Sequence, residues 1–310
     1  MQHLNEPASP RSGPAIVGVF EGGGIGSDWR GRLQPRWMRR TFERVIGTSA
    51  GALVGSLVAA GYSGRELRTV VGEVGWSDLL DPPLVSEIPW IGRHLAMVAW
   101  NGIYRRERLE RTWRRLLAAK GVHTFDDMAP GTLRGVATDL THTKPAVFPD
   151  DLKAYDLDRL RFLVARAVLM SAAVPFAFRT VKIPRPDGPK IHLADGAMAA
   201  KFPVQLATFQ PGTPVVGLRL AEGNEAHGHH DIRGPLSLAA AVISSGMGAR
   251  ETLPNLCSGL RRVVHVPITH DPLDFQLTRS QALDLFDIGY EAGDRYFDAV
   301  DAGAFSFDDM

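Results

Sequence analysis

The chain has 310 residues, of which 45% are hydrophobic and 22% charged, so it can bury a sizeable core as one large domain or two small ones. Its 35 Lys and Arg residues balance 34 Asp and Glu residues, which excludes an overall field that would draw the molecule onto nucleic acid or anionic lipid. Cys257 is the only cysteine, so an internal disulfide is excluded and its thiol is expected to fill core space instead of acting as a nucleophile.

Residues 1–14 are interpreted as a flexible lead, because they lack the apolar centre of a signal peptide. We therefore expect a cytoplasmic protein. The longest weakly polar run, residues 50–61, is shorter than the roughly 20 residues that a membrane-spanning helix needs. A membrane span is excluded on this basis, and peripheral contact with a membrane surface is left open.

The first predicted strand is the apolar run at 15–20, which leads into three glycines as a buried parallel strand leads into a turn. A second short strand is predicted at 44–46. It is followed by small apolar residues at 50–61 that predict a buried helix, with Gly61 as its stop signal.

Further helices are indicated by capping and periodicity. Ser63 and Glu66 have the spacing of a capping box and predict a helix start. The irregular, apolar stretch at 84–100 suits a lid, with ordinary loop packing as its alternative. Leucines and a tryptophan at helical spacing then predict an amphipathic helix at 104–120.

Strands and helices alternate through the rest of the chain. Later strands are predicted at 133–138, 179–183, 191–194, 215–220 and 263–267. Helices are predicted between them, at about 157–170, 235–253 and 278–299. This order predicts an α/β fold with three layers, α/β/α, in which helices cover both faces of a mostly parallel central sheet. No linker divides the chain, so we expect one domain.

A G-x-S-x-G sequence, Gly47 to Gly51, lies between a predicted strand and a predicted helix. In that place the glycines permit a sharp turn that lifts the hydroxyl of Ser49 out of the sheet. The following helix directs its first amides and the positive end of its dipole to the same point. Such a pentapeptide is common by chance, and its placement is what favours Ser49 as a nucleophile.

A serine hydroxyl needs a base to take its proton. The ten histidines offer alternatives for this base, among them His192, His227, His229, His230 and His265, but their contexts are weak. The three at 227–230 lie in a polar loop typical of solvated or metal-binding tracts, and His265 alternates with valines as a core residue of a strand would. Asp195 has the better position, because it ends a strand and precedes Gly196, which lets a partner approach. Its alternative role is to cap a turn.

Acyl transfer also needs donors for the oxyanion of its transition state. Gly22, Gly23 and Gly24 supply closely spaced amides after the first strand. The alternative for this loop is to cradle phosphates in a nucleotide-binding oxidoreductase, which would retain a cofactor on purification. There the third glycine of G-x-G-x-x-G falls at Ser27, and Glu21 would repel a phosphate.

Four segments, in chain order, resemble the signatures of patatin-like phospholipases: F-E-G-G-G-I, G-T-S-A-G-A-L-V-G-S-L-V-A-A-G-Y-S, S-A-A-V-P-F-A-F and D-G-A. The resemblance covers about residues 15–220 and implies a patatin-like phospholipase domain there, with 221–310 as the C-terminal part of the same domain. It implies the three-layer fold, a lipid or acyl-ester substrate, no cofactor and no metal. The oligomeric state is not indicated.

The resemblance also implies roles for particular residues. Ser49 and Asp195 become a catalytic dyad without histidine, and Gly22 to Gly24 become the oxyanion hole. The supporting motif positions are Gly47, Gly51, Gly196 and Ala197. An Asp with an ordinary pKa of about 3.9 is a weak base for a hydroxyl. We hypothesise that burial beside an apolar substrate raises its basicity.

Residues 26–41 depart from the family pattern, because an Arg-rich stretch with Pro35 stands where the family has an apolar helix. One hypothesis is a compensated frameshift, which the nucleotide sequence would decide. The alternative is a divergent surface that binds anionic headgroups. Lys201 also replaces the usual asparagine, which questions the positioning of Asp195. These departures favour a second reading, a catalytically weakened protein that binds lipid or a partner.

Overall fold

The computed structural model of the chain describes residues 16–21, 42–79, 102–185, 188–207, 215–221, 241, 263–267 and 277–302. Its strands are β1 Ile16–Phe20, β2 Phe42–Thr48, β3 Gly102–Tyr104, β4 Leu133–Asp139, β5 Lys144–Phe148, β6 Phe176–Phe178, β7 Val181–Ile183, β8 Ile191–Asp195, β9 Val215–Ala221 and β10 Val263–Pro267. Its helices are α1 Ala50–Ala59, α2 Gly64–Glu73, α4 Glu107–Ala118, α5 Val164–Ser171, α6 Ala197–Ala200 and α8 Arg279–Asp301, with 3₁₀ turns at Trp76–Leu79, Phe125–Asp127, Leu152–Tyr155 and Val204–Ala207.

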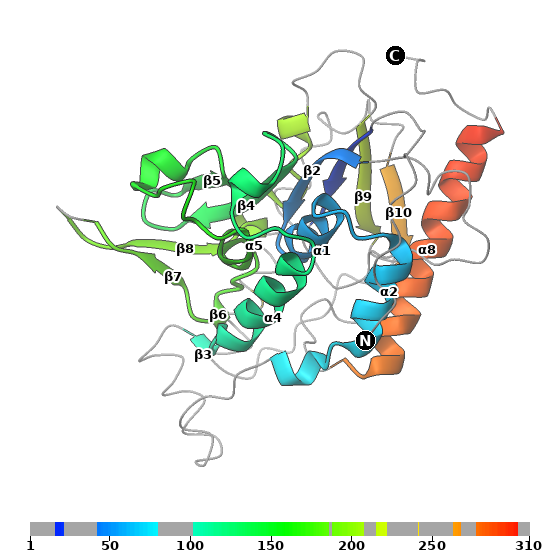
Figure 1. Ribbon diagram of the computed structural model, residues 1–310, viewed down its shortest axis with the longest axis horizontal. Coiled ribbons are helices and arrows are strands. Elements are labelled where there is room, and N and C mark those ends of the chain that lie inside the picture. Colours follow the sequence, from blue (N-terminus) through cyan, green and yellow to red (C-terminus); the bar gives the residue numbers. More distant parts are fainter. Residues whose placement is uncertain are drawn as a thin grey trace.

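The main sheet of the described residues has the order β10-β9-β1-β2-β4-β8-β7, and β5 pairs with β4 off this path (Figure 1). Every pair from β10 to β4 is parallel, whereas β5 and β8 pair antiparallel with β4, and β7 pairs antiparallel with β8. The sheet is therefore mixed and mostly parallel, with helices flanking it. This confirms the predicted α/β class.

The strand β1 buries side chains on both faces of the sheet. Ile16 and Phe20 pack in the larger core cluster, together with residues of α1, α2, α4, α5 and α8. Val17 and Val19 point the other way, into a smaller cluster that includes Ala207. A strand that is buried on both faces has no polar alternation, which is why its sequence is a continuous apolar run.

Two of the predicted helices have the ends and faces that their sequences indicate. In α2, the Ser63 hydroxyl accepts the N–H of Glu66, and the Glu66 carboxylate accepts the N–H of Ser63 at 2.8 Å, so the capping box is confirmed. In α4, the side chains of Leu109, Trp113 and Leu117 are buried along one face. The prediction of an amphipathic helix is therefore confirmed, but its start is wrong, because Tyr104 belongs to β3 and α4 begins at Glu107.

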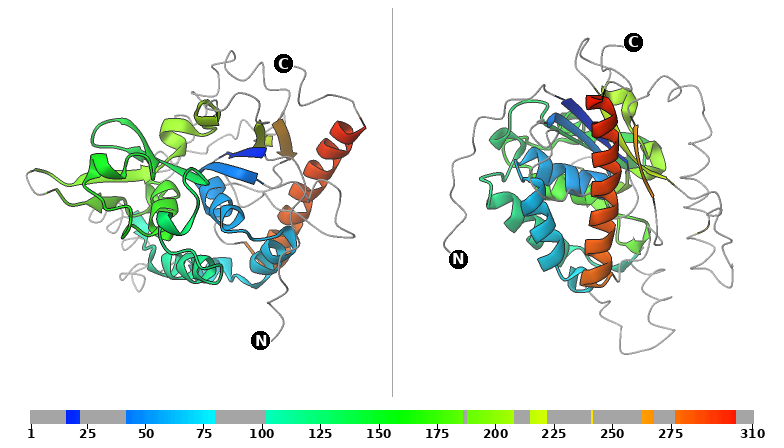
Figure 2. Two further views of the ribbon diagram at one scale, coloured as in Figure 1. Left: turned by 45° about the horizontal axis from the view of Figure 1, so that its top comes forward. Right: turned by 90° about the vertical axis from the view of Figure 1, so that its right-hand side faces the viewer.

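The C-terminal helix α8 packs against α2 and the edge strand β10 (Figure 2). It begins after Thr278, whose hydroxyl accepts the N–H of Gln281. Its buried aromatic residues, Phe286 and Phe297, belong to the larger core cluster. The helix predicted at 278–299 is thus confirmed. Through α2, it packs the C-terminal part of the described chain against its N-terminal part.

The strand β4 is where two strands of opposite direction come together. β5 pairs with residues 135–139 along one edge of β4. Because this stretch overlaps the residues of β4 that pair with β2 and those that pair with β8, both β2 and β8 must lie along the other edge of β4. β2 runs parallel to β4 and ends at Thr48, opposite Val136. β8 runs antiparallel to it and ends at Asp195, opposite Ala137. The carboxyl ends of β2 and β8 therefore face each other along one edge of β4.

The predicted helix at 157–170 is only partly present, because α5 begins at Val164. The Asp158 carboxylate accepts a backbone N–H two residues further on, which stabilises a turn in place of a helix. Leu163 also forms an isolated antiparallel bridge with Thr124. These contacts hold the residues before Val164 in a loop, so the first half of the prediction is wrong.

Three strands were not predicted: β3, β5 and β6. β3 and β6 have three residues each and form a separate parallel pair, so they are too short to show a period. β5 returns from β4 through a turn in which the Asp139 carboxylate accepts the N–H groups of Thr141 and His142. Thr143 in this turn has a φ of 56°, which the sequence does not announce.

Several predictions lie outside the described residues: the lead at 1–14, the divergent stretch at 26–41, the lid at 84–100, the helix at 235–253 apart from residue 241, and Cys257. Within the described residues, every helix is too short or too polar to span a membrane.

Candidate active site

Ser49 occupies the corner between β2 and α1, with a φ of 54° and a ψ of −125°. This conformation is unusual for a residue with a side chain, and such strain costs of order 1–3 kcal/mol. The Ser49 carbonyl accepts the N–H groups of Ala52 and Leu53, so α1 begins directly behind the corner. The turn therefore presents the hydroxyl at the end of β2, next to the positive end of the helix dipole.

Gly47 and Gly51 flank this corner because neighbouring backbone segments approach each of them closely. A Cβ atom on Gly47 would lie 2.5 Å from the carbonyl oxygen of Gly51. A Cβ atom on Gly51 would lie 2.5 Å from the carbonyl oxygen of Glu21. Side chains at these positions would push α1 away from β1 or β2, so the two glycines keep the helix against the ends of both strands.

The opposed ends of β2 and β8 bring Ser49 and Asp195 together. The Ser49 hydroxyl donates a hydrogen bond to Oδ2 of Asp195 at 2.5 Å, and Oδ1 of Asp195 accepts the N–H of Ala197 at 2.8 Å. Ser49 is 8% exposed and Asp195 is 1% exposed. The two side chains that the sequence singled out therefore share a short hydrogen bond in a nearly dry environment.

Burial is the main influence on the protonation of Asp195. Removal from water disfavours the charged carboxylate and raises its pKa to about 6 from the ordinary 3.8. The hydrogen bonds from Ser49 and from the N–H of Ala197 act in the opposite direction and are outweighed. A carboxylate with this pKa is a stronger base than a solvated aspartate, yet it is still ionised at neutral pH.

Ser171, the last residue of α5, connects both halves of the site. Its hydroxyl accepts the N–H of Ser49 at 2.8 Å and donates to the carbonyl oxygen of Val136 in β4. Its own carbonyl accepts the N–H of Gly196 at 3.0 Å. Ser171 is fully buried. Ser171 thus holds both the strained corner at Ser49 and Gly196, the residue after the acid, at the end of α5. The sequence analysis missed this role.

Gly196 is required by the close approach of β4. A Cβ atom at this position would lie 1.9 Å from the carbonyl oxygen of Val136 and 3.0 Å from the methyl group of Thr48. The preceding residue is held as well, because the Asp195 carbonyl accepts the hydroxyl of Thr138 at 2.7 Å. With Ala197 donating to the carboxylate, these contacts fix the acid on both sides.

The predicted oxyanion glycines, Gly22 to Gly24, lie outside the described residues, but Glu21 before them is described and buried. Its Oε2 accepts the N–H of Leu220 at 2.6 Å, and its Oε1 lies 3.5 Å from Nζ of Lys201 and 3.6 Å from Nε of Arg219. The residue at which the glycine loop begins is therefore tied to β9 and to the segment after α6. Lys201 thus forms an ion pair with Glu21.

Among the described residues, the hydrogen bonds of Ser49 and Asp195 involve no histidine. The ring of His192 lies 3.2 Å from the Thr180 hydroxyl. His265 was expected in the core and is exposed, because the neighbouring valines of β10 take the inward positions of the alternating strand. The three histidines at 227–230 lie outside the described residues.

A search of the described residues for three or more His, Cys, Asp or Glu side chains grouped to hold a metal ion finds none. The described site therefore consists of a polarised hydroxyl, a buried carboxylate and the backbone groups that position them. Chemically, this arrangement suits transfer of a proton from the hydroxyl to the carboxylate as the oxygen attacks an electrophile.

Comparison with known proteins places this geometry in context. The family model of the patatin-like phospholipases matches residues 18–208. The uncharacterized protein YqhO of Bacillus subtilis (strain 168) is 32% identical over 280 residues, which cover 88% of this chain and 95% of that protein. The crystal structure of the type III effector protein ExoU aligns with a TM-score of 0.44 and 14% identity over 92% of this chain, and the chain spans 53% of its length.

Proposed function

The chain belongs to the patatin-like phospholipase family, and from this premise we propose that it is a serine acyl hydrolase in which Ser49 is the nucleophile and Asp195 its base. The observation that carries the proposal is the 2.5 Å hydrogen bond between the two side chains at the strained corner after β2. A nucleophile within reach of its base is the geometric requirement for covalent catalysis.

In the acylation step, Ser49 Oγ attacks the carbonyl carbon of an acyl ester while Asp195 takes the hydroxyl proton. The negative charge that develops on the substrate oxygen is stabilised by backbone N–H groups of Gly22 to Gly24, the predicted oxyanion hole. The tetrahedral intermediate then collapses. The bond to the alcohol oxygen breaks, and that oxygen leaves with the proton that Asp195 returns to it.

Deacylation repeats these steps with water in place of serine. Asp195 takes a proton from the water as its oxygen attacks the acyl carbon, and Ser49 leaves with the proton that Asp195 held. The free fatty acid and the regenerated hydroxyl are the products. The raised pKa of Asp195 suits this double use, because the carboxyl must accept and release a proton in each half of the cycle.

We propose fatty acyl esters of lipids as the substrate class, and this proposal is supported by the family and by nothing in the site itself. The curated relative has no assigned activity, so it adds no narrower substrate. The preferred headgroup and acyl chain length would be determined with a panel of substrates in which one of the two is varied at a time.

The test is labelling by a fluorophosphonate probe together with hydrolysis of a short-chain p-nitrophenyl ester. Wild type should be labelled and should turn over, and Ser49→Ala should lose labelling and at least about 10³-fold in kcat/KM. Ser56→Ala is the matched control, since Ser56 is equally buried on α1 and its hydroxyl donates only to the carbonyl of Leu53. Equal rates in wild type and Ser49→Ala would overturn the proposal.

A second candidate, a catalytically weakened protein that binds lipid or a partner, is favoured by one observation. Residues 26–41 are Arg-rich where the family has an apolar helix beside the glycine loop. This candidate predicts that phospholipid vesicles retain the protein while fluorophosphonate does not label it. Labelling at Ser49 with turnover excludes this candidate.

A further inference from the structure

Four arginines gather away from the Ser49–Asp195 site, at the ends of β3 and β6. Arg105 and Arg106 follow β3, Arg179 follows β6, and Arg166 lies in the first turn of α5. Tyr104 of β3 pairs with the last residue of β6, and its carbonyl accepts the N–H of Arg179 at 3.3 Å. Arg105 and Arg179 therefore stand at matching positions just past the carboxyl ends of two parallel strands.

Arg106 is half-buried, and its guanidinium lacks a partner for one buried nitrogen. Nη1 of Arg106 and Nε of Arg105 are both shielded from solvent, and within the described part of the chain neither donates a hydrogen bond. Burial, and after it the positive charges of Arg166 and Arg179, lower the pKa of Arg106. A buried cation with unused donors is unfavourable unless a negative group pairs with it.

Nearby carboxylates do not supply this negative group. Glu107 and Glu110 act to raise the pKa of Arg106, but their effect is smaller than that of burial. Glu110 pairs with Arg114 at 3.2 Å. Among the ion pairs of the described residues, none joins Arg106 to Glu107 or Glu110. Among the described residues, Arg106 therefore has no carboxylate within ion-pair distance.

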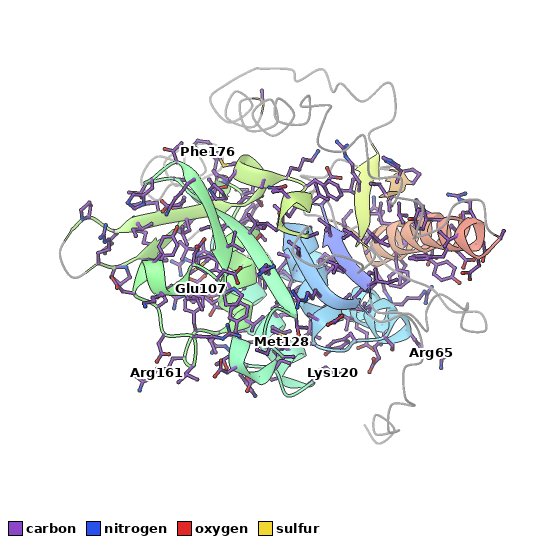
Figure 3. The ribbon with its side chains drawn as sticks, turned by 90° about the horizontal axis from the view of Figure 1, so that it is seen from above. Arg65, Glu107, Lys120, Met128, Arg161 and Phe176 are labelled. Atoms are coloured by element: carbon purple, nitrogen blue, oxygen red, sulfur yellow. The ribbon has the colours of Figure 1, made fainter. Side chains whose placement is uncertain are left out.

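The backbone around the cluster favours an anion as well. Arg106 is the residue before the first turn of α4, a helix of 12 residues, and its side chain makes no capping hydrogen bond. The helix directs its first N–H groups and the positive end of its dipole to this place. Figure 3 labels Glu107, the first residue of α4, and Phe176, the first residue of β6.

We propose that Arg105, Arg106, Arg166 and Arg179 form a binding site for a phosphate group, carried by a lipid headgroup or by a soluble phosphate compound. Guanidinium groups match the oxygens of phosphate with two parallel hydrogen bonds, which is the chemistry that the unused donors offer. The segment 171–179 begins at Ser171 in the catalytic site and ends at Arg179 in the cluster. If the phosphate belongs to a lipid, it would be the headgroup phosphate of the substrate class proposed above. Only this lipid form of the proposal rests on the proposed function.

The first experiment measures thermal unfolding in millimolar inorganic phosphate and in chloride at matched ionic strength. Phosphate should raise the Tm of wild type by about 5 °C through binding to the folded state. Arg106→Gln should lose most of this shift, and its Tm in chloride should equal or exceed that of wild type, because an unpaired buried charge has been removed. Arg115→Gln, at the exposed far end of α4, is the matched control and should keep the shift.

Two results would overturn the proposal. One is an equal phosphate shift in wild type and Arg106→Gln, which would mean that phosphate acts on the protein surface in general. The other is a lower Tm, or a failure to fold, for Arg106→Gln in chloride, which is what a merely structural arginine predicts. Neither result depends on ester hydrolysis, so labelling of Ser49 reports separately on the proposed function.

The second experiment distinguishes the two sources of phosphate. Co-sedimentation with phosphatidylcholine vesicles, with and without phosphatidic acid, is compared for wild type, Arg106→Gln and Arg115→Gln, and glycerol 3-phosphate is tested as a soluble competitor. Vesicle binding that Arg106→Gln alone loses identifies a lipid headgroup. A Tm shift with glycerol 3-phosphate but no vesicle binding identifies a soluble ligand. If neither the vesicles nor glycerol 3-phosphate bind, the proposed phosphate site does not exist.

Discussion

Two regions of the molecule bury polar groups. One is the junction where β2 and β8 end side by side on β4, with Ser49, Ser171 and Asp195, and the other is the arginine cluster at the ends of β3 and β6. They differ in where the hydrogen-bond partners of these groups come from. At the junction, Ser49, Ser171 and Asp195 satisfy one another and the backbone of β4. At the cluster, one buried nitrogen each of Arg105 and Arg106 has no hydrogen-bond partner among the residues that the structure describes. A saturated network fixes its geometry before substrate arrives, whereas leftover donors indicate a group that arrives from outside.

The largest expected effect comes from changing the charge of the junction without changing its shape. Asp195→Asn keeps an acceptor for the N–H of Ala197 but removes the base, so kcat/KM should fall by about 10⁴. Steady-state hydrolysis of a p-nitrophenyl ester measures this fall. A variant that keeps a tenth of wild-type activity would mean that another group takes the proton.

The same variant should also change stability in a pH-dependent way. The folded-state pKa of Asp195 is about 6 and the ordinary value is 3.8, so the folded protein holds this proton more tightly, and stability is lost as pH rises through about 6. Above that pH the loss is about 3 kcal/mol. Asp195→Asn should therefore be more stable than wild type at pH 8 and about equally stable below pH 4, as urea unfolding at both pH values would show.

The next effect is steric and concerns Gly196. In Gly196→Ala the new methyl group would overlap the carbonyl oxygen of Val136, so β8 and β4 must separate, and we expect a loss of at least about 3 kcal/mol in unfolding free energy. Gly188→Ala is the matched control, because its Cβ would meet nothing within 4 Å. It should stay within about 0.5 kcal/mol of wild type. Equal stabilities for the two variants would contradict the close approach at β4.

Ser171→Ala should have a smaller effect, confined to the positioning of the corner. It removes the hydrogen bonds that the Ser171 hydroxyl makes with the N–H of Ser49 and the carbonyl of Val136, which costs about 2 kcal/mol of stability. We expect kcat to fall by about 10 to 100-fold with little change in KM, since the strained corner loses its support. Ser56→Ala has the same chemistry at an equally buried position and should leave kcat unchanged. A loss in KM alone would point to substrate binding instead.

The contact between Ser49 and Asp195, the proposed catalytic pair, could be anticipated from the sequence because each residue follows a local signal: the G-x-S-x-G corner for Ser49 and the strand end before Gly196 for Asp195. Ser171 could not, because a helix-ending serine looks the same whether its hydroxyl meets solvent or a residue 122 positions away. The reversal of β8 against β4 carries no local signal either. It is a pairing choice, and it alone places the two ends face to face.

The same limit explains the cluster and the errors. Arg105 and Arg106 fall within the helix predicted at 104–120, and Arg179 falls within the strand predicted at 179–183. In the structure α4 begins only at Glu107 and β7 only at Val181, so these arginines instead follow the short strands β3 and β6, which show no period in the sequence. His265 was assigned to the core from its valine neighbours, although alternation on a strand puts it on the opposite face from them. Apolar runs that are buried on both faces, such as β1, were the part of the fold that could be read directly.

The smallest expected effect, and the one that separates the junction from the cluster most cleanly, is the pH dependence of activity. Asp195 must be ionised to accept a proton, so kcat/KM should fall about tenfold per pH unit below its pKa of about 6 and level off above it. His142→Gln, His192→Gln and Arg106→Gln should each leave this limb in place. A limb that moves when one histidine is replaced, or that lies near 4, would mean that burial does not tune the base, since 4 is where a solvated aspartate titrates.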